Sequence, residues 1–181
     1  MMDGMELLDV LTPDGLASGR TKEKREVHRD GDWHRAAHVW LVTPDGRVLL
    51  QRRSATKENW PDLWDVSVAG HISAGESAFD SAIREAHEEI GLVLTPDQLT
   101  HLGTLRWHAV LNDGAYIENE FHEVFVAMVV IDLDALVLDP SEVAEVTLVQ
   151  PEEIERYEVV PHDEEYALLR TYLGTSRRSR I

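Results

Sequence analysis

The sequence predicts an α/β or α+β domain built around a central β-sheet. Helix-like and strand-like hydrophobic patterns are mixed along its 181 residues, and turn residues that favour antiparallel hairpins separate several of the strand pairs. No stretch has the length and composition of a linker. The chain is therefore expected to form one domain with a sizeable core, since 43% of its residues are hydrophobic.

The N-terminal part is predicted to form two hairpins and a buried strand. "ELLDVLTPDGLASG" predicts a strand, a turn and a returning strand, with Pro13 at the second position of a type I turn. The same "TPDG" lies between strands expected near residues 36–43 and 47–52. The apolar run "LWDVSVAGHI" predicts one buried strand that ends near Gly70.

A helix is predicted for "ESAFDSAIREAHEEIG", with its end at Gly91. Apolar residues recur at every fourth position of this segment, which places them on one side of a helix. They are mostly small, so this side is suited to lie close on a sheet. The residues at this spacing are Ala78, Ala82, Ala86 and Ile90.

The C-terminal part is predicted to add strands and two helices. Residues 101–133 predict two long strands around the turn "NDG", and residues 145–150 a short strand. One helix is expected to begin near Pro151, and "DEEYALLRTYL" predicts a second that ends at Gly174.

Composition excludes several classes of function. The chain has 34 Asp and Glu against 17 Lys and Arg, so it lacks the basic surface that non-specific nucleic-acid binding needs. It has no cysteine, which excludes disulfides, zinc–thiolate sites and thiol nucleophiles. No stretch of about 18 residues is apolar enough to span a membrane, and the start does not have the pattern of a secretory signal. We expect a cytoplasmic protein with neither nucleic acid nor membrane as partner.

Three glutamates share one face of the helix predicted before Gly91. Glu85, Glu88 and Glu89 fall within an arc of roughly 100°. Their mutual repulsion and the negative end of the helix dipole both oppose this arrangement. A solvated acidic face is one interpretation, and a bound divalent cation, which prefers clustered carboxylate oxygens, is the other.

The wider segment from Gly70 to Leu92 resembles the signature of the Nudix hydrolases: Gly, five residues, Glu, seven residues, Arg-Glu, an apolar residue, any residue, Glu-Glu, any residue, Gly and an apolar residue. Every fixed position is met, which by chance occurs on the order of once in 10⁸ to 10⁹ windows. The residues are Gly70, Glu76, Arg84, Glu85, Ala86, Glu88, Glu89, Gly91 and Leu92.

The resemblance implies a mixed β-sheet sandwiched between helices. It divides the chain into an N-terminal extension (1–33) packed on the domain, a Nudix domain (34–174) and a disordered tail (175–181). It also implies Mg²⁺ as cofactor, with Mn²⁺ as an alternative. Arg84 is expected to orient the loop carboxylates, against the plainer interpretation of a surface salt bridge. The implied metal ligands are Glu85, Glu88, Glu89, the Gly70 carbonyl and a strand glutamate, Glu120 or Glu118.

Nudix enzymes hydrolyse nucleoside diphosphates linked to another moiety, so the resemblance implies a small nucleotide or diphosphate substrate. Water activated beside the metal attacks phosphorus in line. Glu85 is the candidate base, and the expected catalytic set is Glu85, Glu88 and Arg84. The base, the sugar, the linked group and the choice between monomer and homodimer stay open.

A second resemblance covers residues 28–77, which look like type I isopentenyl diphosphate isomerase, an enzyme of the same fold. The matching cations, Lys24, Arg53 and Lys57, are expected to bind the diphosphate. The match implies a second metal site, whose histidines would favour Zn²⁺ or Mn²⁺ over Mg²⁺. A lining of the substrate pocket is the other interpretation of these residues. They are His28, His34, His71, Glu118 and Glu120.

The isomerase chemistry does not carry over to this chain. That family uses a cysteine immediately before Gly-His, where this chain has Ala69. The hydrolase glutamates, by contrast, are complete. Hydrolysis of a nucleotide is therefore the preferred prediction. The alternatives are an isomerase or hydrolase of isoprenoid diphosphates and a catalytically silent nucleotide-binding module.

Overall fold

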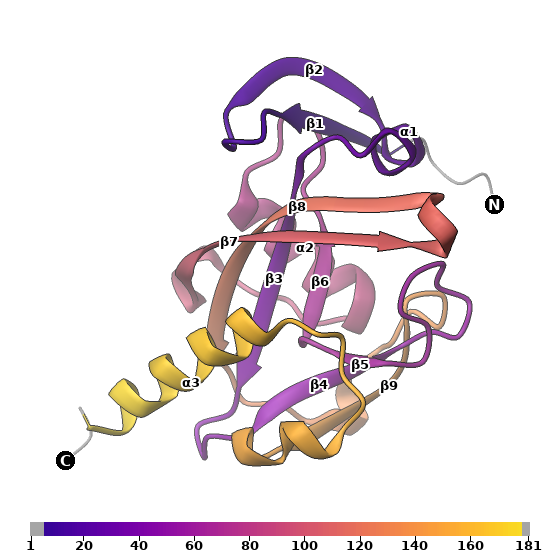
Figure 1. Ribbon diagram of the computed structural model, residues 1–181. Coiled ribbons are helices and arrows are strands. Elements are labelled where there is room, and N and C mark those ends of the chain that lie inside the picture. The colour runs from indigo at the N-terminus through magenta and orange to yellow at the C-terminus, as the bar shows by residue number, and fades with distance from the viewer. Residues whose placement is uncertain (1–5, 179–181) are drawn as a thin grey trace.

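The computed structural model describes residues 6–178, which form a small two-stranded sheet and a larger seven-stranded one (Figure 1). The path of the larger sheet runs β5-β4-β3-β8-β7, with β6 also paired to β3 and β9 to β4. Its central pair, β3 and β8, is parallel, whereas its other pairs are antiparallel. Its strands are β3 (His34–Val42), β4 (Val48–Arg53), β5 (Trp64–Asp65), β6 (Val68–His71), β7 (Leu99–Leu111), β8 (Tyr116–Met128) and β9 (Val143–Val149).

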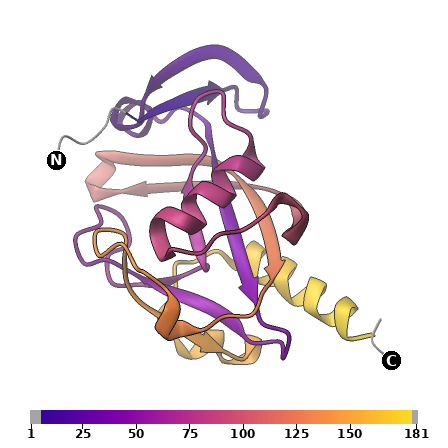
Figure 2. The same ribbon diagram turned by 180° about the vertical axis from the view of Figure 1, so that it is seen from behind.

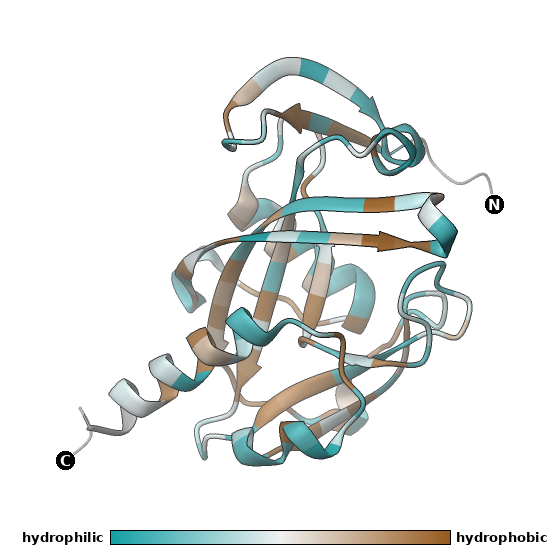
Figure 3. Cartoon of the chain, in the orientation of Figure 1, coloured by the Kyte–Doolittle hydropathy of each residue, from teal (hydrophilic) through white to brown (hydrophobic). Residues whose placement is uncertain are grey.

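Helices α2 (Ala78–Ile90) and α3 (Asp163–Arg178) cover opposite faces of this sheet (Figures 1 and 2). Side chains alternate along β3, so Val39 belongs to the core beneath α2 and Trp40 to the core beneath α3. Hydrophobic residues accordingly gather on the middle strands (Figure 3). The prediction of a mixed sheet between helices is confirmed.

Helix α2 has the ends that the sequence predicts. The Ser77 hydroxyl accepts a hydrogen bond from the Asp80 amide at 3.1 Å and caps the N-terminus. Gly91 takes the left-handed conformation, with φ of 70°, and ends the helix. Ala82 and Ala86 are fully buried in the core beneath α2.

The N-terminal segment forms a hairpin and a short helix above the end of the sheet (Figure 1). Strands β1 (Leu7–Leu11) and β2 (Ala17–Glu23) pair as predicted. Helix α1 (Lys24–Asp30) was not predicted, although its left-handed C-cap at Gly31 is a helix-end signal. The Leu11 amide donates to the Trp33 carbonyl at 2.7 Å, which ties the hairpin to the chain that enters β3.

Two predicted strands differ from the structure. "LWDVSVAGHI" forms β5 and β6 rather than one strand, because Ser67 leaves the ladder: its hydroxyl donates to the Leu49 carbonyl and accepts from the Leu41 amide. The predicted hairpin of β3 and β4 is joined by a single pair, Val42 with Val48. Beyond it the two strands diverge, and each takes other partners.

Two predicted helices also differ. Residues Pro151–Arg156 form a 3₁₀ rather than an α-helix, one of four such segments; the others are Pro96–Gln98, Asn112–Gly114 and Leu133–Ala135. Helix α3 continues past Gly174 to Arg178, because an exposed glycine weakens a helix by about 1 kcal/mol without breaking it. The predicted tail therefore begins inside a helix, and its last residues, 179–181, lie outside the described part of the chain, as do residues 1–5 of the predicted extension. Within residues 6–178, none of the helices has the length and apolar character needed to cross a membrane.

Candidate active site

A polar cleft of about 1740 Å³ opens where the ends of β6 and β8 meet α1 and α2. It collects side chains that lie far apart in the sequence. The signature glutamates line one part of it, and His71, Glu120 and the 56–60 loop line other parts. The predicted site residues that line it are Lys24, Arg53, Lys57, Gly70, His71, Arg84, Glu85, Glu88, Glu89, Glu118 and Glu120.

Arg84 is the centre of the signature segment. Its Nε and Nη2 donate to the Glu76 carboxylate at 3.0–3.3 Å, and Nη2 also donates to the His71 carbonyl at 3.1 Å. Its Nη1 donates to Glu85 at 2.7 Å and to Glu88 at 3.0 Å. The guanidinium thus joins the loop to the helix. Asp80, four residues before Arg84, accepts from the Ser77 hydroxyl at the start of the helix instead.

Gly70 is required because the Glu85 carboxyl group lies directly against its Cα. A Cβ on residue 70 would overlap the Glu85 side chain. The backbone of Gly70 has no positive φ, so close approach rather than conformation explains the glycine. The signature glycine and the first signature glutamate therefore form one contact.

Glu89 is buried and faces the strands rather than the solvent. Its Oε2 accepts from the Gln51 side chain at 3.2 Å and from the Ala69 amide at 3.3 Å. Burial, together with the charges of Glu85 and Glu142, raises the pKa of Glu89 well above its usual value. A desolvated carboxylate among like charges is the environment that a bound cation stabilises.

The signature carboxylates form an open set around the cleft. Glu88 is the exposed member, and Glu85 is buried except for 12% of its side chain. Burial raises the pKa of Glu85 to about 7, despite the neighbouring charge of Arg84. Hard oxygen donors with an unfavourable excess of negative charge fit a hydrated divalent cation such as Mg²⁺. Glu85, Glu88 and Glu89 could hold it, and Gly70 lies against Glu85.

The predicted second metal site has histidines that are already oriented. His28 Nδ1 lies 2.9 Å from the Lys24 carbonyl, and His34 Nδ1 lies 3.0 Å from the Asp32 carbonyl. A carbonyl oxygen only accepts, so Nδ1 carries the proton in both rings. In a neutral ring Nε2 would then be available to a cation, and His28 Nε2 is buried without a hydrogen-bond partner. Metal-binding histidines are commonly fixed in this manner.

The Nε2 atoms of His28, His34 and His71 converge on Glu120. Its Oε1 lies 3.1 Å from His34 Nε2, 3.4 Å from His71 Nε2 and 3.8 Å from His28 Nε2. Atoms bound at about 2.1 Å to a tetrahedral ion are separated by about 3.4 Å, so these spacings fit a shared ion. The four ligand atoms all lie within 4.8 Å of one another. Three imidazoles and a carboxylate suit Zn²⁺ or Mn²⁺.

Glu118 lies outside that group. Its carboxylate accepts from the Asn59 amide at 3.2 Å and from the indoles of Trp60 and Trp107 at 3.4 and 2.9 Å. Three donors therefore fix it in the wall of the cleft. Glu120, the other candidate strand ligand, is directed toward the histidines, which engage both of its oxygens.

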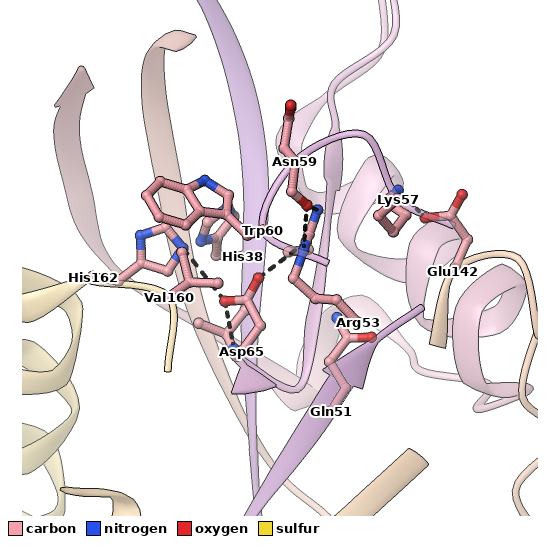
Figure 4. Close-up of polar contacts among 12 residues, drawn as sticks. His38, Gln51, Arg53, Lys57, Asn59, Trp60, Asp65, Glu142, Val160 and His162 are labelled. Atoms are coloured by element: carbon pink, nitrogen blue, oxygen red, sulfur yellow. Dashed lines mark hydrogen bonds and ion pairs between the residues drawn. The ribbon is translucent and has the colours of Figure 1, made fainter. Parts of the chain in front are cut away.

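Each predicted diphosphate-binding cation has an acidic partner. Lys24 pairs with Glu6 at 2.9 Å, and Lys57 pairs with Glu142. The Arg53 guanidinium is more fully engaged: it donates to the Asp65 carboxylate and twice to the Asn59 carbonyl (Figure 4). Arg53 thus holds the loop that precedes β5, and the two lysines lie at the cleft with simple ion pairs.

A buried polar layer on the α3 side of the sheet was not predicted from the sequence. Asp65 lies between Arg53 and His162 (Figure 4), and burial would raise its pKa, but His162 and Arg53 hold it at about 2. The spacing of His122 two residues after Glu120 was an available signal, because both share one strand face. No local pattern pointed to the α3 residue of this layer. Its remaining members are His38, His122 and Glu165.

Comparisons with known proteins agree with this geometry. The model of the NUDIX domain matches residues 32–169. Nudix hydrolase 3 of Arabidopsis thaliana is 44% identical over 155 residues, or 84% of this chain, but the match spans only 20% of that protein. An isopentenyl-diphosphate Delta-isomerase of Streptomyces griseus is 36% identical over 86% of this chain and 77% of its own length. An uncharacterized Nudix hydrolase of Clostridium acetobutylicum is 31% identical over 84% and 73%, respectively.

Solved structures show the same fold. A Deinococcus radiodurans protein superposes with a TM-score of 0.67 at 20% identity, over 92% of this chain and 98% of its own. The NUDIX domain of Shewanella oneidensis NrtR, complexed with ADP-ribose, has a TM-score of 0.61 at 18% identity, over 77% and 87%. At these identities the likeness concerns the fold alone.

Proposed function

Because the chain belongs to the Nudix family, we propose that it is a divalent-metal-dependent hydrolase of nucleoside di- or triphosphates, or of other compounds linked to a nucleoside diphosphate. One observation carries the proposal: the signature carboxylates line one polar cleft, with Arg84 and Gly70 holding Glu85 in place. The ADP-ribose bound by the Shewanella oneidensis neighbour supports a nucleotide as the ligand class. We assign this chemistry to residues 34–174.

The signature residues have three proposed roles: metal binding, orientation of carboxylates and proton transfer. A divalent cation held by Glu85, Glu88 and Glu89 would neutralise the diphosphate and lower the pKa of a nearby water. Arg84 keeps two of these carboxylates beside the loop that carries Gly70. Glu85 accepts a proton from the attacking water, since its partial burial lets it gain and lose a proton near neutral pH.

The histidine group supplies a second part of the proposed site. His28, His34, His71 and Glu120 would hold Zn²⁺ or Mn²⁺ at the far side of the cleft, where His28 comes from the N-terminal segment. That segment, residues 1–33, is therefore proposed to complete the domain. Lys24 and Lys57 meet the substrate phosphates by exchanging their present acidic partners for them.

Substitution of one exposed glutamate tests the proposal. Glu88→Gln keeps the side-chain volume but removes a carboxylate, so phosphate release at fixed Mg²⁺ should fall by about 10²-fold or more while the melting temperature is retained. Glu155→Gln is the matched control: Glu155 is also exposed and paired with one arginine, Arg170 at 2.7 Å, but it lies outside the cleft lining. Full activity of Glu88→Gln would refute the proposal.

An isoprenoid diphosphate is the second candidate substrate. The arrangement of His28, His34, His71 and Glu120 favours it, as does the similarity to the Streptomyces griseus isomerase. Ala69, however, offers a methyl group where isomerisation needs a thiol. Incubation with isopentenyl diphosphate separates the outcomes: phosphate release would indicate hydrolysis, and dimethylallyl diphosphate would indicate isomerisation. A nucleotide panel assayed in parallel should give the faster turnover.

A further inference from the structure

A second buried group lies next to the histidine site, on the α3 side of the sheet. His38 belongs to β3, His122 to β8 and Glu165 to the first turn of α3. Their exposed fractions are 4%, 2% and 1%. These residues lie outside the Nudix signature, and the proposed reaction does not use them directly.

The spacing within this group is that of hydrogen bonds rather than of a metal site. His122 Nδ1 lies 2.7 Å and His38 Nδ1 2.8 Å from the same oxygen, Glu165 Oε1. Ligands of one tetrahedral ion would be about 3.4 Å apart. The His38 and His122 rings are also stacked, with centroids 4.0 Å apart. His122 is hydrogen-bonded to Glu165, His38 pairs with the same oxygen, and both contacts are shorter than the spacing of ligands around one tetrahedral ion.

His122 connects this unit to the histidine site. Its Nδ1 faces Glu165 at 2.7 Å, and its Nε2 faces Glu120 Oε2 at 2.8 Å. Carboxylate oxygens only accept, so both ring nitrogens donate and the ring is an imidazolium.

The two carboxylate oxygens of Glu120 therefore have different partners. Oε2 is held by His122, while Oε1 is the atom on which His28, His34 and His71 converge. A carboxylate fixed through one oxygen has little freedom to rotate. Its other oxygen is therefore already at the position that a metal ligand must occupy.

We propose that Glu165 and His122 are positioning residues, which hold Glu120 in the orientation that the histidine metal site requires. The inference rests on the metal site proposed above. It makes α3 part of the active site, although no α3 residue belongs to the signature segment or to the residues matched to the isomerase. Loss of the Glu165 charge would free the His122 ring, and Glu120 would then lose its fixed orientation.

Zinc binding to the full chain tests the inference. Zn²⁺ is titrated in excess Mg²⁺, which occupies the signature carboxylates, and a competing chelator gives the dissociation constant. The wild-type chain should bind one Zn²⁺ that His34→Asn abolishes. Glu165→Gln should weaken this binding by about 10- to 100-fold, which is typical for loss of a group that orients a ligand. It should also reduce the zinc-induced rise in melting temperature.

Two comparisons separate positioning from general destabilisation. Glu164→Gln makes the same change on the adjacent, exposed residue of α3 and should leave zinc affinity unchanged. His122→Gln should weaken binding as Glu165→Gln does. Because Glu165 acts through His122, adding Glu165→Gln to His122→Gln should cause no further loss.

Three results would overturn the inference. Wild-type zinc affinity in either folded variant would show that Glu120 needs no such support. Additive losses in the double variant would show that Glu165 acts by another route. Absence of zinc binding by the wild-type chain would remove the histidine metal site itself. That failure appears before any variant is made, and it leaves the hydrolase proposal to be decided by Glu88→Gln.

Discussion

At the scale of single residues, the site depends on contacts that tolerate no added atom. The Gly70–Glu85 contact is the clearest example, because the carboxyl group occupies the space of a missing Cβ. Arg84 is similar, since its guanidinium donates to three carboxylates and to the His71 carbonyl. Both residues were found in the sequence by their spacing, but the reason for each identity is visible only in these contacts.

Gly70→Ala should therefore impair catalysis more than stability. The new methyl group would displace the Glu85 carboxylate, so we expect kcat/KM to fall by about 10²-fold and the Mg²⁺ concentration for half-activation to rise. Steady-state kinetics over a range of Mg²⁺ concentrations measure both effects. Gly174→Ala adds the same methyl group in open space and should leave activity unchanged. Normal Mg²⁺ activation of Gly70→Ala would contradict the role assigned to this contact.

At the scale of elements, the break between β5 and β6 lets one segment serve two parts of the sheet. Ser67 makes the break, because its hydroxyl donates to the Leu49 carbonyl at 2.6 Å and accepts from the Leu41 amide at 2.8 Å. Strand β5 then pairs with β4, while β6 pairs with β3 and carries Gly70 and His71 to the cleft. A single continuous strand could not have both neighbours in this order.

Ser67→Ala should destabilise the fold through this break. The Leu41 amide would be left buried without an acceptor, which costs about 1–3 kcal/mol. Urea unfolding should show a lower midpoint with an unchanged slope, since the exposed surface on unfolding is the same. Thr43→Ser, which keeps a buried hydroxyl, serves as the comparison. An unchanged midpoint for Ser67→Ala would mean that water replaces the lost hydroxyl.

In helix α3 a substitution is expected to increase the free energy of unfolding rather than to lower it. Gly174 lies within the helix, and a methyl group added at its Cα would meet no other atom within 4 Å. Gly174→Ala should stabilise the protein by about 0.5–1 kcal/mol, because alanine loses less backbone entropy on folding. Thermal or urea unfolding measures the gain. A loss of stability would indicate that α3 does not continue through this residue in solution.

At the scale of the whole molecule, the acidic cleft should make metal-free stability depend on pH. The pKa of Glu85 is about 7 in the folded protein, against an ordinary value of 4.5, so the folded state retains a proton that the unfolded state loses. The contribution of Glu85 to stability is then greatest below pH 4.5 and declines up to pH 7, by on the order of 3 kcal/mol. Asp65, with a pKa of about 2, contributes nothing to the slope in this window.

Thermal unfolding in EDTA between pH 4.5 and 7 measures this decline. Glu85→Gln, which is neutral throughout, should show a shallower slope and should be more stable than the wild-type chain at pH 7. Added Mg²⁺ should raise the wild-type melting temperature at pH 7 more than at pH 5. A slope that is equal in both proteins would exclude Glu85 as its source.

Local pattern by itself determined a large part of this protein. Hydrophobic patterning and turn residues identified β3, β8 and α2, because β3 and much of β8 are buried and α2 buries one face against the core. The fixed spacing of the signature identified Gly70, Arg84 and the three glutamates, because one loop and one helix carry all of them. Helix α1 was missed, since seven residues carry too little periodicity, and Gly174 was misread as an end, since glycine only weakens a helix.

Only the tertiary structure decided which strands lie together and what reaches the cleft. The parallel pairing of β3 with β8 joins residues 86 positions apart and brings His34 to Glu120. Packing of α3 on the same face brings Glu165 to His122. No local propensity encodes these approaches, because they arise from burial of two sheet faces at once. The sequence thus determined the residues of the signature, and the fold decided which buried groups lie beside them.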